Sequence, residues 1–119
     1  MNGLPPGIDL TSIVGRQLDV VSFARWTVVF VFDDRAVRIA VEGTIRISGQ
    51  SLKPCEIDDY RANATSLCQF IGATIEAAVR TANGGMELGM SSGDRITFEN
   101  SKTGYESFQL HIGETVFVA

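Results

Sequence analysis

A strand, a short turn and a second strand are predicted twice along this chain of 119 residues. The first pair spans residues 26–32 and 36–41 around the turn 33–35, and the second spans residues 86–90 and 95–99 around the turn 91–94. Within these segments apolar residues recur at every second position, as they do in strands with one buried face. Short turns between such strands favour antiparallel hairpins. The chain is therefore limited to folds that contain a largely antiparallel sheet.

The turns predict how the strands of each hairpin are paired. A two-residue turn at Asp34 and Arg35 puts three apolar pairs on one face of the first hairpin: Phe32 with Val37, Phe30 with Ile39, and Val28 with Val41. A three-residue loop at 92–94 pairs Met90 with Ile96 and Leu88 with Phe98 in the second. A third hairpin is expected between residues 105–112 and 115–118, because Gly113 and Glu114 suit a type II′ turn.

One long helix is predicted between the two halves of the sheet, over residues 63–82. Its apolar residues are spaced as one face of a helix requires, at Leu67, Phe70, Ile71, Ile75, Ala78, Val79 and Ala82. Asn83, Gly84 and Gly85 then tolerate the left-handed backbone that ends many helices.

Other signals complete the predicted order of elements. A helical turn is expected at residues 9–15, a strand at 17–23 and another at 44–48, with Gly43 bending the chain from one sheet region to the next. The order is about four strands, one helix and about four strands, so the predicted class is α+β with a largely antiparallel sheet of about seven to eight strands. The sheet is expected to curl, or to form a sandwich or partial barrel. We expect a single domain over residues 1–119, with a flexible N-terminal segment at 1–8.

Charge and hydropathy exclude two classes of partner. The formal net charge is −4 and no basic run occurs, which argues against binding to nucleic-acid phosphates. The longest apolar stretch, Val28–Phe32, is far shorter than a membrane span. The first nine residues have neither the basic nor the apolar region of a secretory signal, so we expect a cytoplasmic protein without a membrane partner. In that setting Cys55 and Cys68 are expected to be reduced, buried thiols.

Several residues invite a catalytic or metal-binding interpretation that the sequence does not support. Residues 89–93 match G-x-S-x-G, but a nucleophile elbow joins a strand to a helix, whereas here a second strand follows. We therefore interpret Ser91 as a turn residue. His111 is the only histidine and is expected on a solvated strand face. The pairs Asp33–Asp34 and Asp58–Asp59 lack the spaced ligands of a calcium loop, so no metal, cofactor or catalytic residue is predicted.

Glu106 and Trp26 need separate interpretations. Strand parity places Glu106 on the face of Phe108 and Leu110, where a carboxylate needs a partner. It is expected, in order of preference, to lock the sheet through hydrogen bonds, to lie at an exposed rim, or to belong to a ligand site. Trp26 is expected to be a core residue of its strand, because no other exposed aromatic residues accompany it at the spacing of stacked bases.

Four short motifs resemble those of small uncharacterised bacterial domains of the actinobacterial type. They are Ile-Val-Gly-Arg-Gln-Leu at 13–18, Phe-Val-Phe-Asp-Asp at 30–34, Ser-Gly-Asp at 92–94 and, above all, Tyr-Glu-Ser-Phe at 105–108. The resemblance covers about residues 10–118. The chain departs from it at Asp34-Arg35, where an Asp-Gly turn is expected. The resemblance implies a domain of unestablished function, and similar small acidic domains occur among proteins suspected of immunity to bacterial toxins.

Three functions are compatible with these observations. The first is a non-enzymatic protein-interaction module, such as an immunity-type inhibitor of a basic partner, whose candidate binding residues are Asp33, Asp34, Glu56, Asp58, Asp59, Tyr105 and Glu106. The second is a small-ligand carrier with an apolar cavity lined by Trp26, Met86, Met90, Phe98 and Phe108. The third, an enzyme using Tyr105, Glu106 and His111, is disfavoured because parity separates Glu106 from the other two. A homodimer through an edge strand at residues 116–118 is also compatible.

Overall fold

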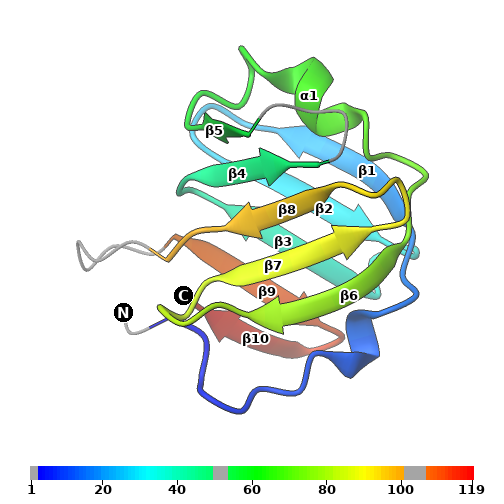
Figure 1. The fold of residues 1–119 in the computed structure, drawn as a ribbon, viewed down its shortest axis with the longest axis vertical. Coiled ribbons are helices and arrows are strands. Elements are labelled where there is room, and N and C mark those ends of the chain that lie inside the picture. The colour runs from blue at the N-terminus through cyan, green and yellow to red at the C-terminus, as the bar shows by residue number, and fades with distance from the viewer. Residues whose placement is uncertain (1–2, 50–53, 101–106) are drawn as a thin grey trace.

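The computed structural model describes residues 3–49, 54–100 and 107–119 and shows two antiparallel sheets packed face to face (Figure 1). The first sheet has the strand order β1-β2-β3-β9-β10, formed by β1 (Leu18–Phe23), β2 (Val28–Phe32), β3 (Val37–Val41), β9 (Phe108–Ile112) and β10 (Thr115–Val118). The second has the order β5-β4-β8-β7-β6, formed by β4 (Ile45–Ser48), β5 (Cys55–Ile57), β6 (Ile75–Arg80), β7 (Met86–Met90) and β8 (Arg95–Phe98). Helical structure in the described residues is confined to a 3-10 turn, η1 (Thr11–Ile13), and to α1 (Ala64–Cys68).

The predicted α+β class and its long central helix are wrong. Only Ala64–Cys68 of the expected helix is helical, and the same stretch ends in the strand β6. Gly72 interrupts it with a φ of +93°, in the left-handed region that ends helices. Ile71 and Val79, which a buried helical stripe would cover, are 47% and 53% exposed. Residues 75–80 therefore pair with β7 as a strand, although their apolar residues are spaced as in a helix. The protein is a nearly all-β sandwich.

The first and third hairpins have the predicted pairing, and the second does not. Phe32, Phe30 and Val28 face Val37, Ile39 and Val41 as expected. Thr115 pairs with Ile112 across a turn in which Gly113 has a φ of +58°, as a type II′ turn requires. In the second hairpin Leu88 pairs with Ile96 instead of Phe98, because the Met90 amide donates to the Asp94 carbonyl and the turn falls on residues 91–93.

The chain consists of two halves with the same strand plan. Strands β1 to β3 form a meander in the first sheet, and β4 and β5 then cross to the second. Strands β6 to β8 form a meander in the second sheet, and β9 and β10 cross back to the first. Both β1 and β6 have an irregular register at the same place, after their first residue. The repeated strand pairs in the sequence are thus part of a larger internal repeat with approximate two-fold symmetry.

The two halves are joined where the segments that lead into β1 and β6 cross. Gln17 and Thr74 form an antiparallel bridge at this crossing. The Gly15 amide donates to the Ile75 carbonyl at 2.7 Å, and the equivalent Gly72 amide donates to the Leu18 carbonyl at 2.8 Å. Both glycines have a φ near +90°. The approximate two-fold axis therefore passes between Gln17 and Thr74.

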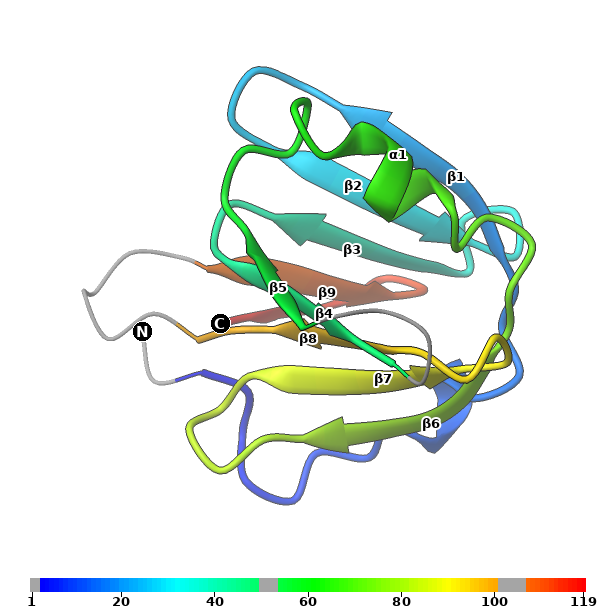
Figure 2. The ribbon, with the colours of Figure 1, turned by 45° about the horizontal axis from the view of Figure 1, so that its top comes forward.

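The core lies between the sheets and is closed at two opposite ends. The Phe98 ring lies 5.5 Å from Phe30 and 6.0 Å from Phe108, centroid to centroid, which links the two sheets. Buried Leu67 and Phe70 close the end beside β1 and β5, and the N-terminal segment runs along the opposite end beside β6 (Figure 2). Within that segment Leu4 is fully buried. No helix among the described residues is long and apolar enough to cross a membrane.

The turn between β2 and β3 holds three consecutive residues in the left-handed region. Asp33, Asp34 and Arg35 have φ values of 43°, 53° and 72°. This conformation costs a residue with a side chain roughly 1 kcal/mol or more, whereas glycine adopts it freely. Because Arg35 stands where an Asp-Gly turn would have glycine, the backbone of this turn is strained.

Arg35→Gly is expected to raise the free energy of unfolding by about 1 kcal/mol, because it relieves the backbone strain at an exposed position. Chemical denaturation measures this change. Arg35→Ala is the matched control, since it removes the same side chain and keeps the unfavourable φ. Equal stabilisation by both variants would contradict the explanation.

Candidate functional site

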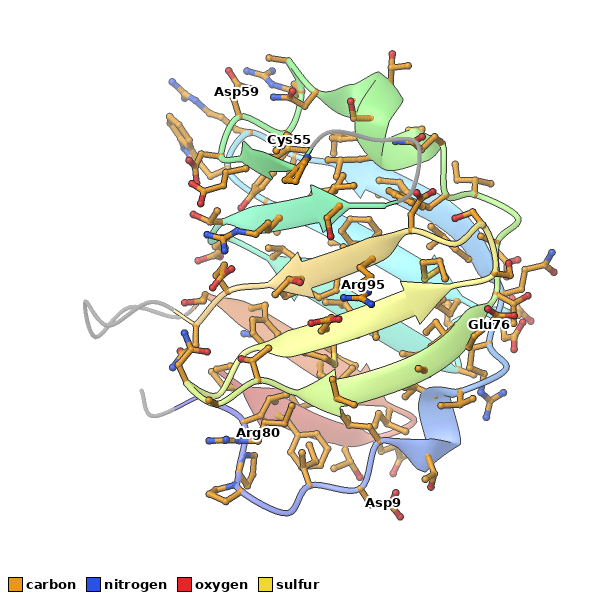
Figure 3. All side chains as sticks on the ribbon, in the orientation of Figure 1. Asp9, Cys55, Asp59, Glu76, Arg80 and Arg95 are labelled. Carbon is orange, nitrogen blue, oxygen red and sulfur yellow. The ribbon has the colours of Figure 1, made fainter. Side chains whose placement is uncertain are left out.

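The candidate site is a hollow at the end of the sandwich where β1 turns into β2. It is lined by Arg25, Trp26, Glu42, Asp58, Asp59, Tyr60 and Arg61, and its volume is about 650 Å³. The Ala24 amide donates to the Thr27 carbonyl and closes the turn that holds Arg25 and Trp26. Residues 58–61 come from the connection that follows β5, where Figure 3 labels Asp59 at the periphery of the molecule.

Trp26 was expected in the core and is instead 73% exposed. It precedes β2, so it belongs to the turn and does not share the buried face of Val28 and Phe30. The Arg25 guanidinium lies 5.1 Å from the centre of the indole ring, within the range of a cation–π contact. A large aromatic surface is thus presented to solvent beside a cation.

Tyr60 fixes the loop that forms the opposite wall of the hollow. Its side chain is only 6% exposed, and its hydroxyl donates a hydrogen bond to the Gly43 carbonyl. Burial, together with the negative charges of Asp58 and Glu42, raises the pKa of Tyr60 to about 12. The phenol therefore remains a hydrogen-bond donor throughout the neutral range.

The carboxylates of the hollow form no ion pair with any described arginine. Asp58 accepts a hydrogen bond of 2.6 Å from the Thr44 hydroxyl, and Asp59 accepts one of 3.1 Å from the Ala62 amide. Glu42 also lacks an arginine within 4.0 Å in the described part of the chain. By contrast, three glutamates on the outer face of the second sheet are paired with arginines, namely Glu56 and Glu99 with Arg46, and Glu87 with Arg95.

The structure separates the acidic residues that the sequence suggested as one binding surface. Asp33 and Asp34 follow β2, at the end of that strand away from Trp26. Asp33 forms an ion pair with Arg16 at 3.7 Å, and the Asp34 amide donates to Asp19. Glu56 projects from β5 and pairs with Arg46, outside the hollow. Tyr105 and Glu106 lie outside the described residues. Of the predicted set, the structure brings together Asp58 and Asp59.

The residues that complete the hollow were not predicted from the sequence. Glu42, Tyr60 and Arg61 come from segments treated as a connection or a strand end, and Arg25 and Trp26 were assigned next to or within a strand. The missed signal was the short interval of residues 24–27 between Phe23 and Val28, which is long enough for a hairpin turn.

The other chemically reactive residues lie elsewhere. Ser91 is a turn residue, as interpreted from the sequence, and its hydroxyl accepts a 2.9 Å hydrogen bond from the Thr74 amide. His111 lies on the outer face of the first sheet, where Nδ1 is 3.3 Å from Arg38. Burial and then the positive charge of Arg38 lower the pKa of His111. Both cysteines are free, and Cys55 on an edge strand is exposed, contrary to the expectation of burial. The described residues contain no cluster of three or more metal-ligating side chains.

The chain belongs to a family of unknown function, described as Family of unknown function (DUF6188), whose model matches residues 9–119. This match confirms the expectation of an uncharacterised domain over most of the chain. Neither a search of curated proteins nor a search of solved structures finds a match.

Tyrosinate absorbance should show one tyrosine that titrates at about pH 12, because Tyr60 is buried beside two carboxylates. Its raised pKa contributes stability that is complete below pH 10, the ordinary tyrosine value, and is lost as pH rises toward 12. Tyr60→Phe should abolish this component, whereas Tyr105→Phe should keep it. Titration of both tyrosines near the ordinary value would contradict the assignment.

NMR titration of the sole histidine should give a pKa below 6.5 for His111. Arg38→Gln should raise that pKa, because it removes a repelling cation, while Arg46→Gln on the other sheet should leave it unchanged. The stability contribution of His111 is present above pH 6.5 and is lost as pH falls through its lowered pKa. A pKa at or above the ordinary value would contradict this prediction.

Proposed function

We propose that the protein is a non-enzymatic protein-binding module, and that the hollow beside Trp26 receives a basic segment of its partner. The observation that carries the proposal is an exposed tryptophan beside three carboxylates that have no arginine partner in the described structure. We keep the sequence-based prediction of a basic partner. The proposed binding surface is now the hollow at this end of the sandwich, in place of the separated acidic residues.

The exposed indole supports a role in binding because of its size and chemistry. Burying a tryptophan removes a large apolar area from water, and tryptophan is enriched among residues that dominate binding energy. The contact with Arg25 shows that this ring is accessible to a guanidinium. A lysine or arginine of a partner would combine a cation–π contact with attraction to Asp58 or Glu42.

The distribution of charge supports a partner with a basic surface. The chain has a net charge of −4, which favours the approach of a positively charged protein at low salt. Arg25 and Arg61 add local positive charge to the hollow, so a matching segment would carry mainly basic residues and one acidic residue. An inhibitor that covers the basic surface of a toxin fits this chemistry.

The alternative of an apolar-ligand carrier has less support. Four of the five expected lining residues, Met86, Met90, Phe98 and Phe108, are 1% exposed or less and belong to the packed core. The helix that was expected to enclose the cavity against the sheet is only the short α1.

Titration with a short lysine- and arginine-rich peptide tests the proposal, because Trp26 is the only tryptophan and its fluorescence reports on this site alone. We expect a saturable, salt-sensitive change with the basic peptide and none with a glutamine-substituted peptide of equal length. The double variant Asp58→Asn/Asp59→Asn should weaken binding by about tenfold, equivalent to ~1.4 kcal/mol. Trp26→Ala, followed by calorimetry, should have at least as large an effect.

Asp34→Asn is the matched control, because it removes a carboxylate at the other end of the strands and should leave affinity unchanged. Absence of saturable binding, or equal loss in the Asp34→Asn variant, would overturn the proposed site.

A further inference from the structure

Among the four edge strands of the two sheets, β10 has the least protection against pairing with another strand. Strands β1 and β6 have irregular registers, and the bridge between Gln17 and Thr74 joins the segments leading into them. Strand β5 has only three residues and follows Pro54. Bulges, short length and proline all hinder edge pairing. In β10, Thr-Val-Phe-Val has a continuous register and contains no proline and no charged residue.

The main-chain groups of Val116 and Val118 point away from the sheet. Ala119 exchanges hydrogen bonds with Phe108 in both directions, at 3.2 Å and 2.9 Å. Because such pairs alternate along an antiparallel ladder, Phe117 also bonds toward β9, and Val116 and Val118 present their amides and carbonyls to the free edge. Val116 is 48% exposed.

The other half of the chain blocks these same two positions. In the internal repeat, β4 corresponds to β9 and β5 corresponds to β10. Ile45 and Phe108 are equivalent, because they pair with the equivalent residues Phe98 and Val41. Ile57 pairs with Ile45 and Ala119 pairs with Phe108, so Ile57 and Ala119 are equivalent too. Counting back along both strands, Pro54 and Glu56 occupy the places of Val116 and Val118. A proline has no amide to donate, and a charged residue resists burial at an edge. The edge is thus protected in the first half and open in the second.

We infer that two copies of the chain associate through β10, with the two strands antiparallel around a two-fold axis. Val116 of each copy then faces Val118 of the other, and about four main-chain hydrogen bonds extend the first sheet across both molecules.

A second copy fits this edge because of the charges and the neighbouring face. Two chains of net charge −4 repel each other over most of their surface, but Thr115–Val118 carries no charge, so the repulsion is least where the strands meet. Antiparallel pairing of a strand with its own copy is self-complementary. It also joins the outward Val116 and Val118 of both copies into one apolar strip.

Sedimentation analysis over a range of concentrations tests the inference on the full chain. We expect a wild-type dimer and a monomeric Val118→Glu variant, since that change gives β10 the residue found at the equivalent place in β5. Val116→Pro should have the same effect and keep the pairing with β9, because the amide it removes faces the free edge. Val79→Glu is the matched control: it adds a charge to an exposed valine on the edge strand β6 and should remain dimeric.

Amide exchange in the wild-type chain provides a test that needs no variant. The Val116 and Val118 amides should become protected as concentration rises, while the amides of the edge strand β6 should not change. A wild-type chain that stays monomeric, or a dimer that persists in both β10 variants, would overturn the inference. Trp26→Ala should remain dimeric, so this result is independent of the proposed binding site.

Discussion

The crossing between residues 15–17 and 72–74 determines how the rest of the sandwich is arranged. Its hydrogen bonds join the segments that lead into β1 and β6, so they hold one edge of each sheet at a fixed distance. The segments that precede the crossing lie at opposite ends of the core, where their residues Ile13 and Phe70 are fully buried. Gly15 and Gly72 both need a positive φ here, and this shared requirement accounts for a glycine in each half.

The hairpins could be predicted where a local pattern determined the pairing, and the helix could not. Alternation in the first hairpin and the Gly113 turn in the third each specified a register that the structure confirms. Between Leu67 and Val79 the apolar spacing fits a helix, but whether Ile75 pairs with Met90 depends on a strand that comes later in the chain. Gly72 was the local signal against one continuous helix, because a left-handed residue in that position separates α1 from β6.

The candidate site was less predictable than the sheet because charge in sequence does not indicate proximity in space. Two adjacent aspartates occur in both the β2–β3 turn and the segment after β5, and sequence alone gave no reason to separate them. Pairing of β2 with β3 and of β4 with β5 puts these loops at opposite ends of the strands. The exposure of Trp26 likewise depends on where β2 begins, and a shift of two residues moves the indole from the expected core to solvent.

Comparison of the two halves shows that two equivalent turns of the described structure are packed differently. The turn between β6 and β7 contains Gly84 and Gly85, and the Leu4 amide donates to the Gly84 carbonyl at 2.8 Å. A side chain at Gly85 would place its Cβ 2.5 Å from the Phe98 carbonyl, so this close packing requires glycine. The turn between β1 and β2 has Arg25 and Trp26 instead, and both side chains line the hollow that Tyr60 borders. The same backbone plan thus carries a glycine turn packed against Leu4 in one half, and in the other half a turn that places a cation and an indole beside the hollow.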